Sequence, residues 1–312
     1  MATRYSITIP VYNEAEVVLT LYGRLTQVME MLGEPYEMIF INDGSSDDSA
    51  KLLRELRTKD NRVKFVSFSR NFGHQIAITA GLDYSSGEVV VVMDADLQDP
   101  PEVIPQLIEK WREGYDVVFA VREKREGESL FKRMTATLFY RLFRRLTATD
   151  ILLDAGEFRL MSRRAVEALS AIRERNRFVR GLASWIGFRQ TSITFTRDAR
   201  YTGETKYSLT KMVKLALNGI TSFSALPLQL ATYLGFIASL LSLVYIAYAI
   251  AIKVFTNHAV PGWASIMVAI LFIGGVQLIS LGIIGEYISR IYDEVKQRPL
   301  YLVDELVGFE KK

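Results

Sequence analysis

Apolar and polar positions follow two alternating patterns over the first two thirds of the chain. Short apolar runs, typical of strands buried on both faces, alternate with longer stretches whose apolar residues recur three and four positions apart, as on one face of a helix. The predicted strands are Tyr5–Pro10, Glu37–Ile41, Val63–Phe68, Val89–Met93 and Asp116–Val121. The predicted helices are Val17–Leu32, Asp48–Lys59, Phe72–Asp83 and Glu102–Gly114. This order predicts an α/β domain with a mainly parallel sheet covered on both faces.

Two later apolar runs differ from these because they are longer and contain no charged residue. They span Leu230–Ile252 and Ala264–Gly285. At about 1.5 Å per residue, each is long enough as a helix to cross a hydrocarbon core of about 30 Å. The sequence therefore predicts two transmembrane helices within residues 229–289. A homo-oligomer formed through these helices is a further expectation, because close packing is permitted by Gly274, Gly275, Gly282 and Gly285.

Basic residues flank the two apolar runs. An amphipathic stretch with two lysines, 208–223, precedes the first run, and Arg290, Lys296 and Arg298 follow the second. Because Lys and Arg are enriched on the cytoplasmic side of a membrane, both ends of the chain are expected there. The predicted divisions are an α/β domain (1–207), a juxtamembrane amphipathic helix (208–228), two transmembrane helices (229–289) and a cytoplasmic tail (290–312).

Composition excludes some classes of chemistry. Hydrophobic residues make up 49% of the chain and the mean hydropathy is +0.14, high for a soluble enzyme. The net charge of +3 is mild, so no nucleic-acid partner is expected. There is no cysteine, which excludes a disulfide framework and a thiol nucleophile.

Acidic turns follow three of the predicted strands. Residues 12–14 follow the first strand, Asp43 follows the second, and residues 94–96 follow the central one. Ligands bind outside the carboxyl ends of parallel strands, so three such turns on one rim indicate a nucleotide and metal site. Turn and capping chemistry is the alternative, with Asn13 as a helix N-cap. No G-x-G-x-x-G follows the first strand and no Walker motif occurs, which disfavours dinucleotide oxidoreductases and phosphate-loop kinases.

The turn after the central strand carries ligands for a divalent cation. Asp94 and Asp96 would point to the same side in extended geometry. Two carboxylates and the side-chain carbonyl of Gln98 suit Mg²⁺ or Mn²⁺, whose remaining positions a diphosphate can fill. The alternative is a polar turn at a strand end that binds no ligand.

Three motifs, in this order, resemble the inverting family 2 glycosyltransferases of GT-A fold. They are IPVYNEAE (9–16), INDGSSDDS (41–49) and DADLQDPPE (94–102). The chain is similar in particular to the polyprenyl-phosphate glycosyltransferases, which include bactoprenol glucosyltransferase and dolichol-phosphate mannose synthase. The likeness covers essentially the whole chain, including the two late apolar runs. As a set in this order and at this spacing, the motifs are highly specific for this family.

This resemblance implies roles for residues at matching positions. A part in catalysis is implied for Asp96, and the metal ligands would be Asp94, Asp96 and Gln98. The nucleotide-sugar donor would be bound by Pro10, Tyr12, Glu14, Asp43, Asp94, Ala95, Asp96 and Gln98.

Two further motifs add candidate catalytic residues. DAGEFRL (154–160) resembles the family segment D-x-G-D-F-R-L, with Glu157 where many glucosyl-type members have Asp. This acid would orient the sugar or act as a base, although a phosphate acceptor is already ionised at neutral pH. RYTGETKYS (200–208) matches R-x-x-G-x-[ST]-K-[YF]-S, and Arg200 and Lys206 would offset the repulsion between two anions. Ordinary basic residues near a membrane are the alternative for this pair.

The lipid phosphate would be met by a different set of residues. The stretch 129–146 is amphipathic and basic, as in a helix at a membrane interface or, alternatively, in a core helix with solvated basic residues. The resemblance places Arg122, Arg133 and Thr137 near the acceptor phosphate. The aromatic and basic stretch 176–190 forms either a loop over the acceptor or a helix packed into the domain.

The expected activity is inverting transfer of a single sugar from a nucleotide donor to polyprenyl phosphate at the cytoplasmic membrane face. The resemblance favours UDP-glucose and undecaprenyl phosphate, giving a lipid-linked sugar for surface glycan modification. A processive polysaccharide synthase would share the donor motifs but would normally add a Q-x-x-R-W motif and a larger membrane channel. A lipid-carrier transporter would need a substrate path, for which Glu286 is the only acid near the apolar runs.

Overall fold

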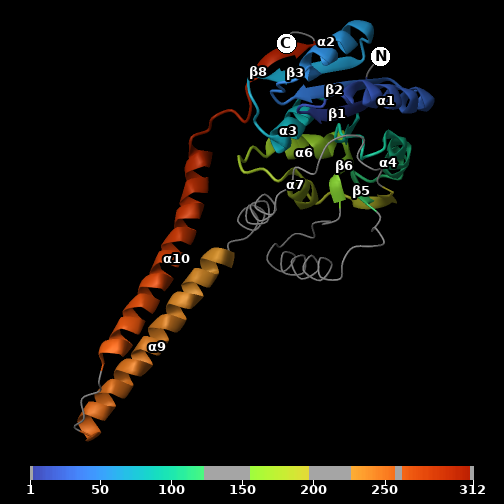
Figure 1. The fold of residues 1–312 in the computed structure, drawn as a ribbon. Helices are drawn as coiled ribbons and strands as arrows, with labels where there is room; N and C mark the ends of the chain where they lie inside the picture. Colours follow the sequence, from blue (N-terminus) through green and yellow to red (C-terminus); the bar gives the residue numbers. More distant parts are fainter. Residues whose placement is uncertain (1–2, 123–154, 197–225, 257–261, 310–312) are drawn as a thin grey trace. The chain divides into compact units, whose positions relative to one another are not determined.

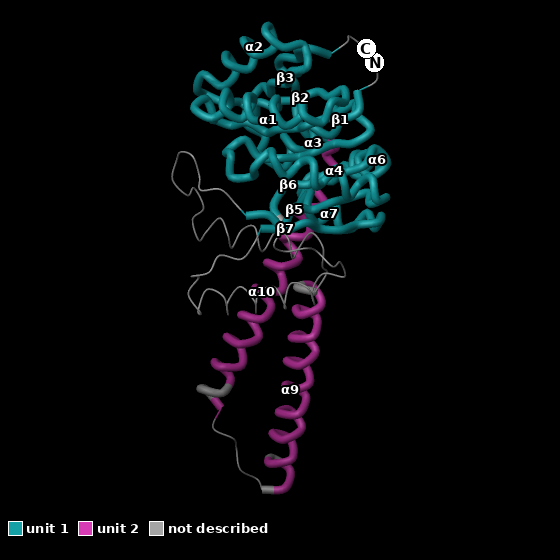
Figure 2. Tube along the Cα trace, turned by 90° about the vertical axis from the view of Figure 1, so that its right-hand side faces the viewer, with its two compact units in different colours: residues 1–144, 149–209, 298–312 teal, residues 145–148, 210–297 magenta. Residues whose placement is uncertain are grey.

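The computed structural model describes residues 3–122, 155–196, 226–256 and 262–309, which form two compact units (Figures 1 and 2). The α/β unit contains the described residues up to 196 together with 298–309, and the helical unit contains 226–256 and 262–297. In chain order the α/β unit consists of β1 (Tyr5–Val11), α1 (Val18–Leu32), β2 (Tyr36–Asn42), α2 (Ser49–Lys59), β3 (Val63–Phe68), α3 (His74–Tyr84), β4 (Val89–Val92), the 3-10 helix η1 (Pro101–Val103), α4 (Ile104–Arg112), β5 (Val117–Arg122), β6 (Ala155–Ser162), α6 (Arg163–Ala171), α7 (Val179–Trp185), β7 (Gln190–Phe195) and β8 (Val303–Val307).

All eight of these strands belong to one sheet, in the order β7-β5-β6-β4-β1-β2-β3-β8. Strands β4, β1, β2 and β3 are parallel neighbours, and β5 is parallel to β7. The strand β6 runs antiparallel to both β4 and β5, and β8 runs antiparallel to β3. The α/β class and the mainly parallel sheet predicted from the sequence are confirmed.

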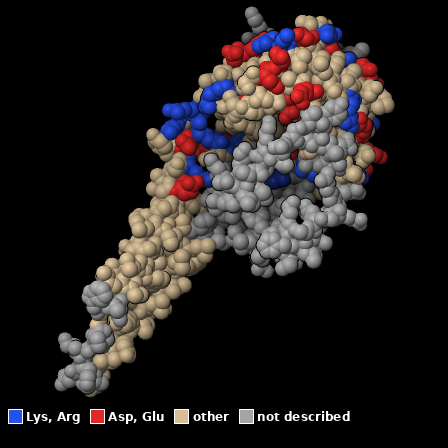
Figure 3. All heavy atoms as spheres, viewed as in Figure 1, with Lys and Arg blue, Asp and Glu red and all other residues tan. Residues whose placement is uncertain are grey.

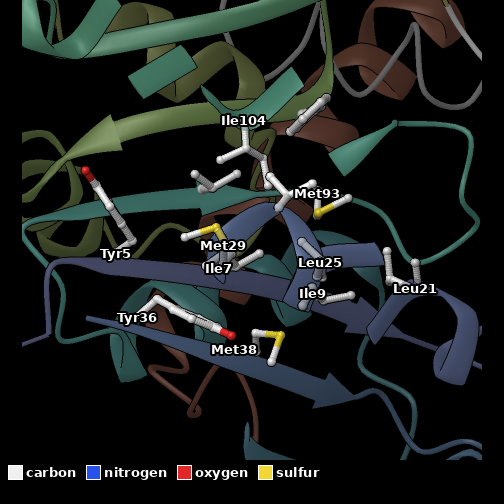
Figure 4. Close-up of a cluster of buried hydrophobic side chains, with 14 of the residues drawn as sticks. Tyr5, Ile7, Ile9, Leu21, Leu25, Met29, Tyr36, Met38, Met93 and Ile104 are labelled. Atoms are coloured by element: carbon white, nitrogen blue, oxygen red, sulfur yellow. The ribbon is translucent and has the colours of Figure 1, made fainter. Parts of the chain in front are cut away.

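Helices cover both faces of this sheet because alternate strand residues are apolar on each side. Ile7 and Ile9 of β1 pack with Leu21, Leu25 and Met29 of α1, all of them fully buried (Figure 4). These α1 residues lie four positions apart, which gives the helix one apolar face. The opposite face of the sheet presents β2 and β3 residues to α3. Apolar side chains therefore cover both faces of the central strands, and charged groups are expected mainly at the strand ends.

The last strand corrects the division of the chain made from the sequence. Residues 290–312 were assigned to a tail, but β8 forms an edge of the sheet, where Val66 pairs with Leu306. Glu305 forms a salt bridge of 2.6 Å with Arg54, and the ring of Tyr301 stacks on Phe68 with centroids 5.0 Å apart. Residues of β8 alternate between half-buried and exposed, as in an edge strand, but the mixed charge of the segment did not indicate a strand.

The helical unit consists of α9 (Leu226–Thr256) and α10 (Trp263–Val295). Both contain a stretch long and apolar enough to cross a membrane, Leu228–Ile252 and Ile266–Val295, with mean hydropathies of 2.2 and 2.4. Figure 3 shows the charged side chains gathered on the α/β unit, whereas most of the length of the two helices is uncharged. Two long apolar helices are thus confirmed, but α9 begins at Leu226, inside the segment assigned to the juxtamembrane helix.

Candidate functional site

The strand order brings the three predicted acidic turns to one rim of the sheet. Val11 at the end of β1 pairs with Asn42 at the end of β2, and Thr8 of β1 pairs with Val92 at the end of β4. Because these strands are parallel neighbours, the turns that follow them leave from the same edge. The loop before α3 also starts at this edge, at the end of β3.

Asn13 holds the first two turns together. Its backbone has a φ of 57°, and its Oδ1 accepts a hydrogen bond of 2.8 Å from the Ser46 N–H. Its own N–H donates to Ser45 Oγ at 3.0 Å. The N-cap assignment made from the sequence is therefore wrong, since α1 begins only at Val18. The turn leaves Tyr12 exposed, while Pro10 is buried and Glu14 is half-buried.

Asp43 fixes the loop that leads into α3. It is buried, and its carboxylate accepts hydrogen bonds from the N–H groups of Phe72 (2.6 Å) and Gly73 (2.9 Å). Burial raises the pKa of Asp43, although the two N–H donors oppose this shift. Gly44 has a φ of 67°, and a Cβ there would lie 2.5 Å from the carbonyl carbon of Arg70, so this approach requires glycine. A direct contact between Asp43 and the donor stays a prediction.

The backbone after β4 is less extended than the sequence suggested. The strand ends at Val92, and residues 95–97 form a bend, so the strand geometry assumed for Asp94 and Asp96 is wrong. Leu97 has a φ of 59°, and the Gln98 N–H donates to Asp96 Oδ1 at 3.2 Å. A side chain-to-backbone hydrogen bond of this kind stabilises a turn.

Burial nevertheless alternates along this bend. The side chains of Ala95 and Leu97 are buried, whereas the partly exposed residues are the expected metal ligands Asp94, Asp96 and Gln98. Among the described residues, no group of three or more His, Asp or Glu could hold a metal ion by itself. Two carboxylates and one amide do suit a hard cation that takes its other ligands from a diphosphate. The chemistry of this donor set therefore fits Mg²⁺ or Mn²⁺ bound together with a nucleotide.

His74 lies beside these acids. It is the first residue of α3, and its Nε2 lies 3.3 Å from Asp94 Oδ1. Burial lowers the pKa of His74, but the hydrogen bond and charge of Asp94, together with Glu157 and Asp43, outweigh this and raise it to about 9. The sequence analysis missed His74. The sequence signal for His74 was its position at the start of α3, the helix that follows β3, whose carboxyl end lies at the same rim.

Glu157 lies opposite the acidic bend. The pairing of β4 with β6 ends at Val92 and Arg159, and Glu157 lies two residues before Arg159 on β6, at the edge from which the bend leaves. Glu157 Oε1 accepts a hydrogen bond of 3.1 Å from Gln75, and Oε2 pairs with the fully buried Arg159. Burial lowers the pKa of Arg159, whereas the charge of Glu157 opposes that shift. Sequence reasoning identified the acid but neither the strand β6 nor the partner Gln75.

Arg122 reaches the same rim from the end of β5. Its Nη2 lies 3.9 Å from Oδ1 of the buried Asp99, and only 3.0 Å from where a Cβ of Gly156 would be. The other expected acceptor and cationic residues, Arg133, Thr137, Arg200 and Lys206, lie outside the described residues, as do the predicted helices 129–146 and 208–223.

The aromatic and basic stretch 176–190 contains the helix α7. The side chain of Leu182 is buried in the domain, as the packed-helix alternative required, but Trp185 is 60% exposed. The structure therefore supports the helix over the loop, with one large aromatic side chain left facing outward.

The sequence is similar to known families and proteins. The sequence matches the family described as Glycosyl transferase family 2 over residues 6–170, and the GtrB C-terminal hairpin over residues 226–291, which contain most of α9 and α10. The chain is 53% identical over 309 residues to the uncharacterized glycosyltransferase YkcC of Bacillus subtilis (strain 168), covering 99% of this chain and 96% of that protein.

One further similar sequence and one similar solved structure were found. The SfII prophage-derived bactoprenol glucosyl transferase of Shigella flexneri is 43% identical over 300 residues, covering 96% of this chain and 97% of that protein. Glucosyl-3-phosphoglycerate synthase from Mycobacterium tuberculosis, solved in complex with phosphoglyceric acid, is 20% identical with a TM-score of 0.48, covering 71% of this chain and 80% of that one.

Proposed function

Because this chain belongs to the family 2 glycosyltransferases, we propose that it transfers one glucose from UDP-glucose to undecaprenyl phosphate at the cytoplasmic face of the cell membrane. The observation that carries the proposal is the near full-length similarity to proteins named bactoprenol glucosyl transferase, which includes the two apolar helices. A lipid acceptor accounts for both parts of the molecule. The sheet rim supplies acids and cations for a nucleotide sugar, and α9 and α10 suit the membrane in which a prenyl chain lies.

The rim supports binding of the donor diphosphate. Asp94, Asp96 and Gln98 would hold Mg²⁺ or Mn²⁺, and the ion would neutralise charge on the diphosphate as it leaves. The imidazole of His74, with Nε2 3.3 Å from Asp94 Oδ1, would orient this carboxylate. The buried Asp43 holds the loop that carries His74, so the two turns form one preorganised surface.

The transfer is a single displacement. An oxygen of the lipid phosphate forms a bond to the anomeric carbon while the bond from that carbon to the donor diphosphate breaks, and UDP leaves with the electron pair. Attack from the face opposite the leaving group inverts the configuration, so an α-linked donor gives a β-linked lipid phosphate sugar. The acceptor is already an anion at neutral pH, so Glu157 orients the sugar and need not remove a proton. Arg122 would contact the acceptor phosphate from β5, together with Arg133 and Thr137. Arg200 and Lys206 would offset the repulsion between the lipid phosphate and the donor diphosphate.

Donor specificity and acceptor identity are tested together in one experiment. Purified full-length protein is incubated with undecaprenyl phosphate, Mn²⁺ or Mg²⁺, and in turn UDP-glucose, UDP-galactose, UDP-N-acetylglucosamine or GDP-mannose, and the lipid is analysed by mass spectrometry. We expect the mass of one hexose to be added from UDP-glucose. Addition of several hexoses would indicate a processive synthase, and an unmodified lipid with every donor would overturn the proposal.

A further inference from the structure

Gln75 joins three elements at the rim. It is the second residue of α3, and its side chain donates from Nε2 to Glu157 Oε1 of β6 at 3.1 Å. On its other side, Oε1 accepts a hydrogen bond of 2.8 Å from the N–H of Val179, the first residue of α7. The first N–H groups of a helix have no partner inside the helix, so this bond satisfies one of them.

The two contacts determine the orientation of the Gln75 amide. The Val179 N–H can only donate, so the atom facing it must be the amide oxygen. The NH₂ group is then directed at Glu157, which as a carboxylate can only accept. The backbone carbonyl of Gln75 also accepts a bond of 2.8 Å from the Thr79 hydroxyl. Glutamine is therefore suited to this position, whereas glutamate of the same size would place two carboxylates in contact.

Glu157 depends on these partners for its direction. One of its oxygens is held by Gln75 and the other by Arg159, which is itself fully buried. Arg159 lies on the same strand two residues away, so it moves with Glu157. Gln75 is a partner from a different element. It therefore fixes the position of Glu157 relative to α3, the helix that also carries His74 next to Asp94.

We propose that Gln75 is a positioning residue for glycosyl transfer, which holds the Glu157 carboxylate toward the donor sugar and ties its orientation to the first turn of α7. This inference rests on the proposed function for the reaction that it assists. Because Gln75 acts through Glu157, its loss lowers the rate of transfer more than the affinity for the donor.

The sharpest variant is Gln75→Glu, which keeps the size of the side chain and an acceptor for the Val179 N–H but removes the donor to Glu157. Hydrogen bonds to charged groups are worth enough to predict a loss of about 10- to 100-fold in kcat. The affinity for UDP with Mn²⁺, measured by calorimetry on the full chain, should change by less than about twofold. Gln75→Met removes both contacts and should lower kcat at least as far.

The matched control is Gln190→Glu. Gln190 contacts the other end of α7, where its Nε2 donates to the carbonyls of Ala183 (2.9 Å) and Ser184 (3.3 Å). This variant therefore disturbs the same helix with the same chemical change but touches neither Glu157 nor the rim. A purely structural role of Gln75 would make the two variants alike in kcat and in thermal midpoint.

A swapped pair tests the contact itself. Gln75→Glu combined with Glu157→Gln restores one donor and one acceptor with the roles exchanged. If Gln75 acts through Glu157, adding Gln75→Glu to the Glu157→Gln variant should lower kcat by less than about twofold. If the loss of kcat in the double variant equals the product of the losses in the two single variants, the proposal is contradicted. Should Gln75 variants fail to fold, Glu157→Asp withdraws the acid from Gln75 without altering α3, and full activity of that variant would overturn the inference.

The outcomes also separate this inference from the proposed function. A wild-type protein that leaves undecaprenyl phosphate unmodified refutes the function. A wild-type protein that transfers glucose, beside a Gln75→Glu variant of unchanged kcat, refutes the role of Gln75 alone.

Discussion

Acidic side chains lie at both ends of the sheet, but their surroundings differ. At the amino end, Glu37 of β2 is buried, forms a salt bridge with Lys64 Nζ (2.5 Å) and accepts a hydrogen bond from Ser6 Oγ (2.5 Å). Near the start of β5, the buried Asp116 is likewise bonded to a serine hydroxyl and to the guanidinium of Arg164. Both acids are enclosed by hydroxyls and cations, an arrangement that stabilises a folded chain.

At the carboxyl end the acids are held differently. Asp94 and Asp96 stay partly exposed, where Asp94 lies beside the imidazole of His74 and Asp96 accepts from a backbone N–H group. Of the other rim acids, Asp43 is buried against two backbone N–H groups, and Glu157 is held by the amide of Gln75 and the guanidinium of Arg159. These donors fix direction without closing the site to a ligand. The comparison teaches that burial with full pairing marks a structural acid, whereas partial exposure with fixed direction marks one placed for chemistry.

The comparison breaks first if an acid at the carboxyl end proves dispensable. Asp96→Asn should lower turnover at least about 100-fold while leaving the thermal midpoint nearly unchanged, because it weakens stabilisation of the leaving diphosphate. Asp116→Asn is the same change at the opposite end and serves as the control, with normal turnover and lower stability. Full activity of the Asp96→Asn variant, or undiminished wild-type activity in excess chelator, would remove the metal role assigned to Asp96.

Glu37 provides the reverse case. Glu37→Gln should lower the free energy of unfolding by about 2 kcal/mol, because it leaves Lys64 without its buried partner, and should leave turnover within about twofold of wild type. Urea unfolding and the transfer assay on the same preparation measure both quantities. A variant that unfolds like wild type but loses activity would place Glu37 among the functional acids.

The pH dependence of stability sharpens the assignment of Glu37. Burial alone would raise its pKa, but hydrogen bonds from Lys64, Ser6 and Ser86 and the charge of Lys64 outweigh it and lower the pKa from its ordinary value of 4.5. A lowered pKa contributes stability that is present above pH 4.5 and is lost as the pH falls through the folded-state value. The difference in unfolding free energy between wild type and Glu37→Gln should therefore shrink below about pH 4.5. A constant difference from pH 7 to the acid limit of folding would contradict this.

The smallest effect is expected for an acid on the exposed edge strand β8. Glu305 of β8 pairs with Arg54 at an exposed edge of the sheet. The side chain of Arg54 is 50% exposed and that of Glu305 is 32% exposed. Glu305→Ala should cost less than about 1 kcal/mol of unfolding free energy, because exposed ion pairs are weak. A loss as large as that of Glu37→Gln would show that the edge strand depends on this one pair.

The same comparison explains what the sequence could predict. The strands from β1 to β5 and the rim turns follow from local patterns, since each apolar run and its polar turn lie together in the chain. Antiparallel β6 and β8 were missed because their partners come from distant segments and their composition is mixed. His74 and Gln75 were missed for a related reason. Their position at a helix start after a strand end indicates a place at the rim, but it does not indicate contact with Asp94 and Glu157, which come later in the chain.

Acceptor chemistry offers the most direct test of the central claim, that the rim joins a nucleotide sugar to a lipid phosphate. Wild-type protein in lipid vesicles is supplied with radiolabelled UDP-glucose and either undecaprenyl phosphate or the matching prenol without phosphate, and label in the lipid fraction is counted. The account predicts label with the phosphate alone, absent in the Asp96→Asn variant and carried by a lipid with the mass of one added hexose. Equal labelling of both lipids, or label in neither while UDP-glucose is consumed, would contradict it.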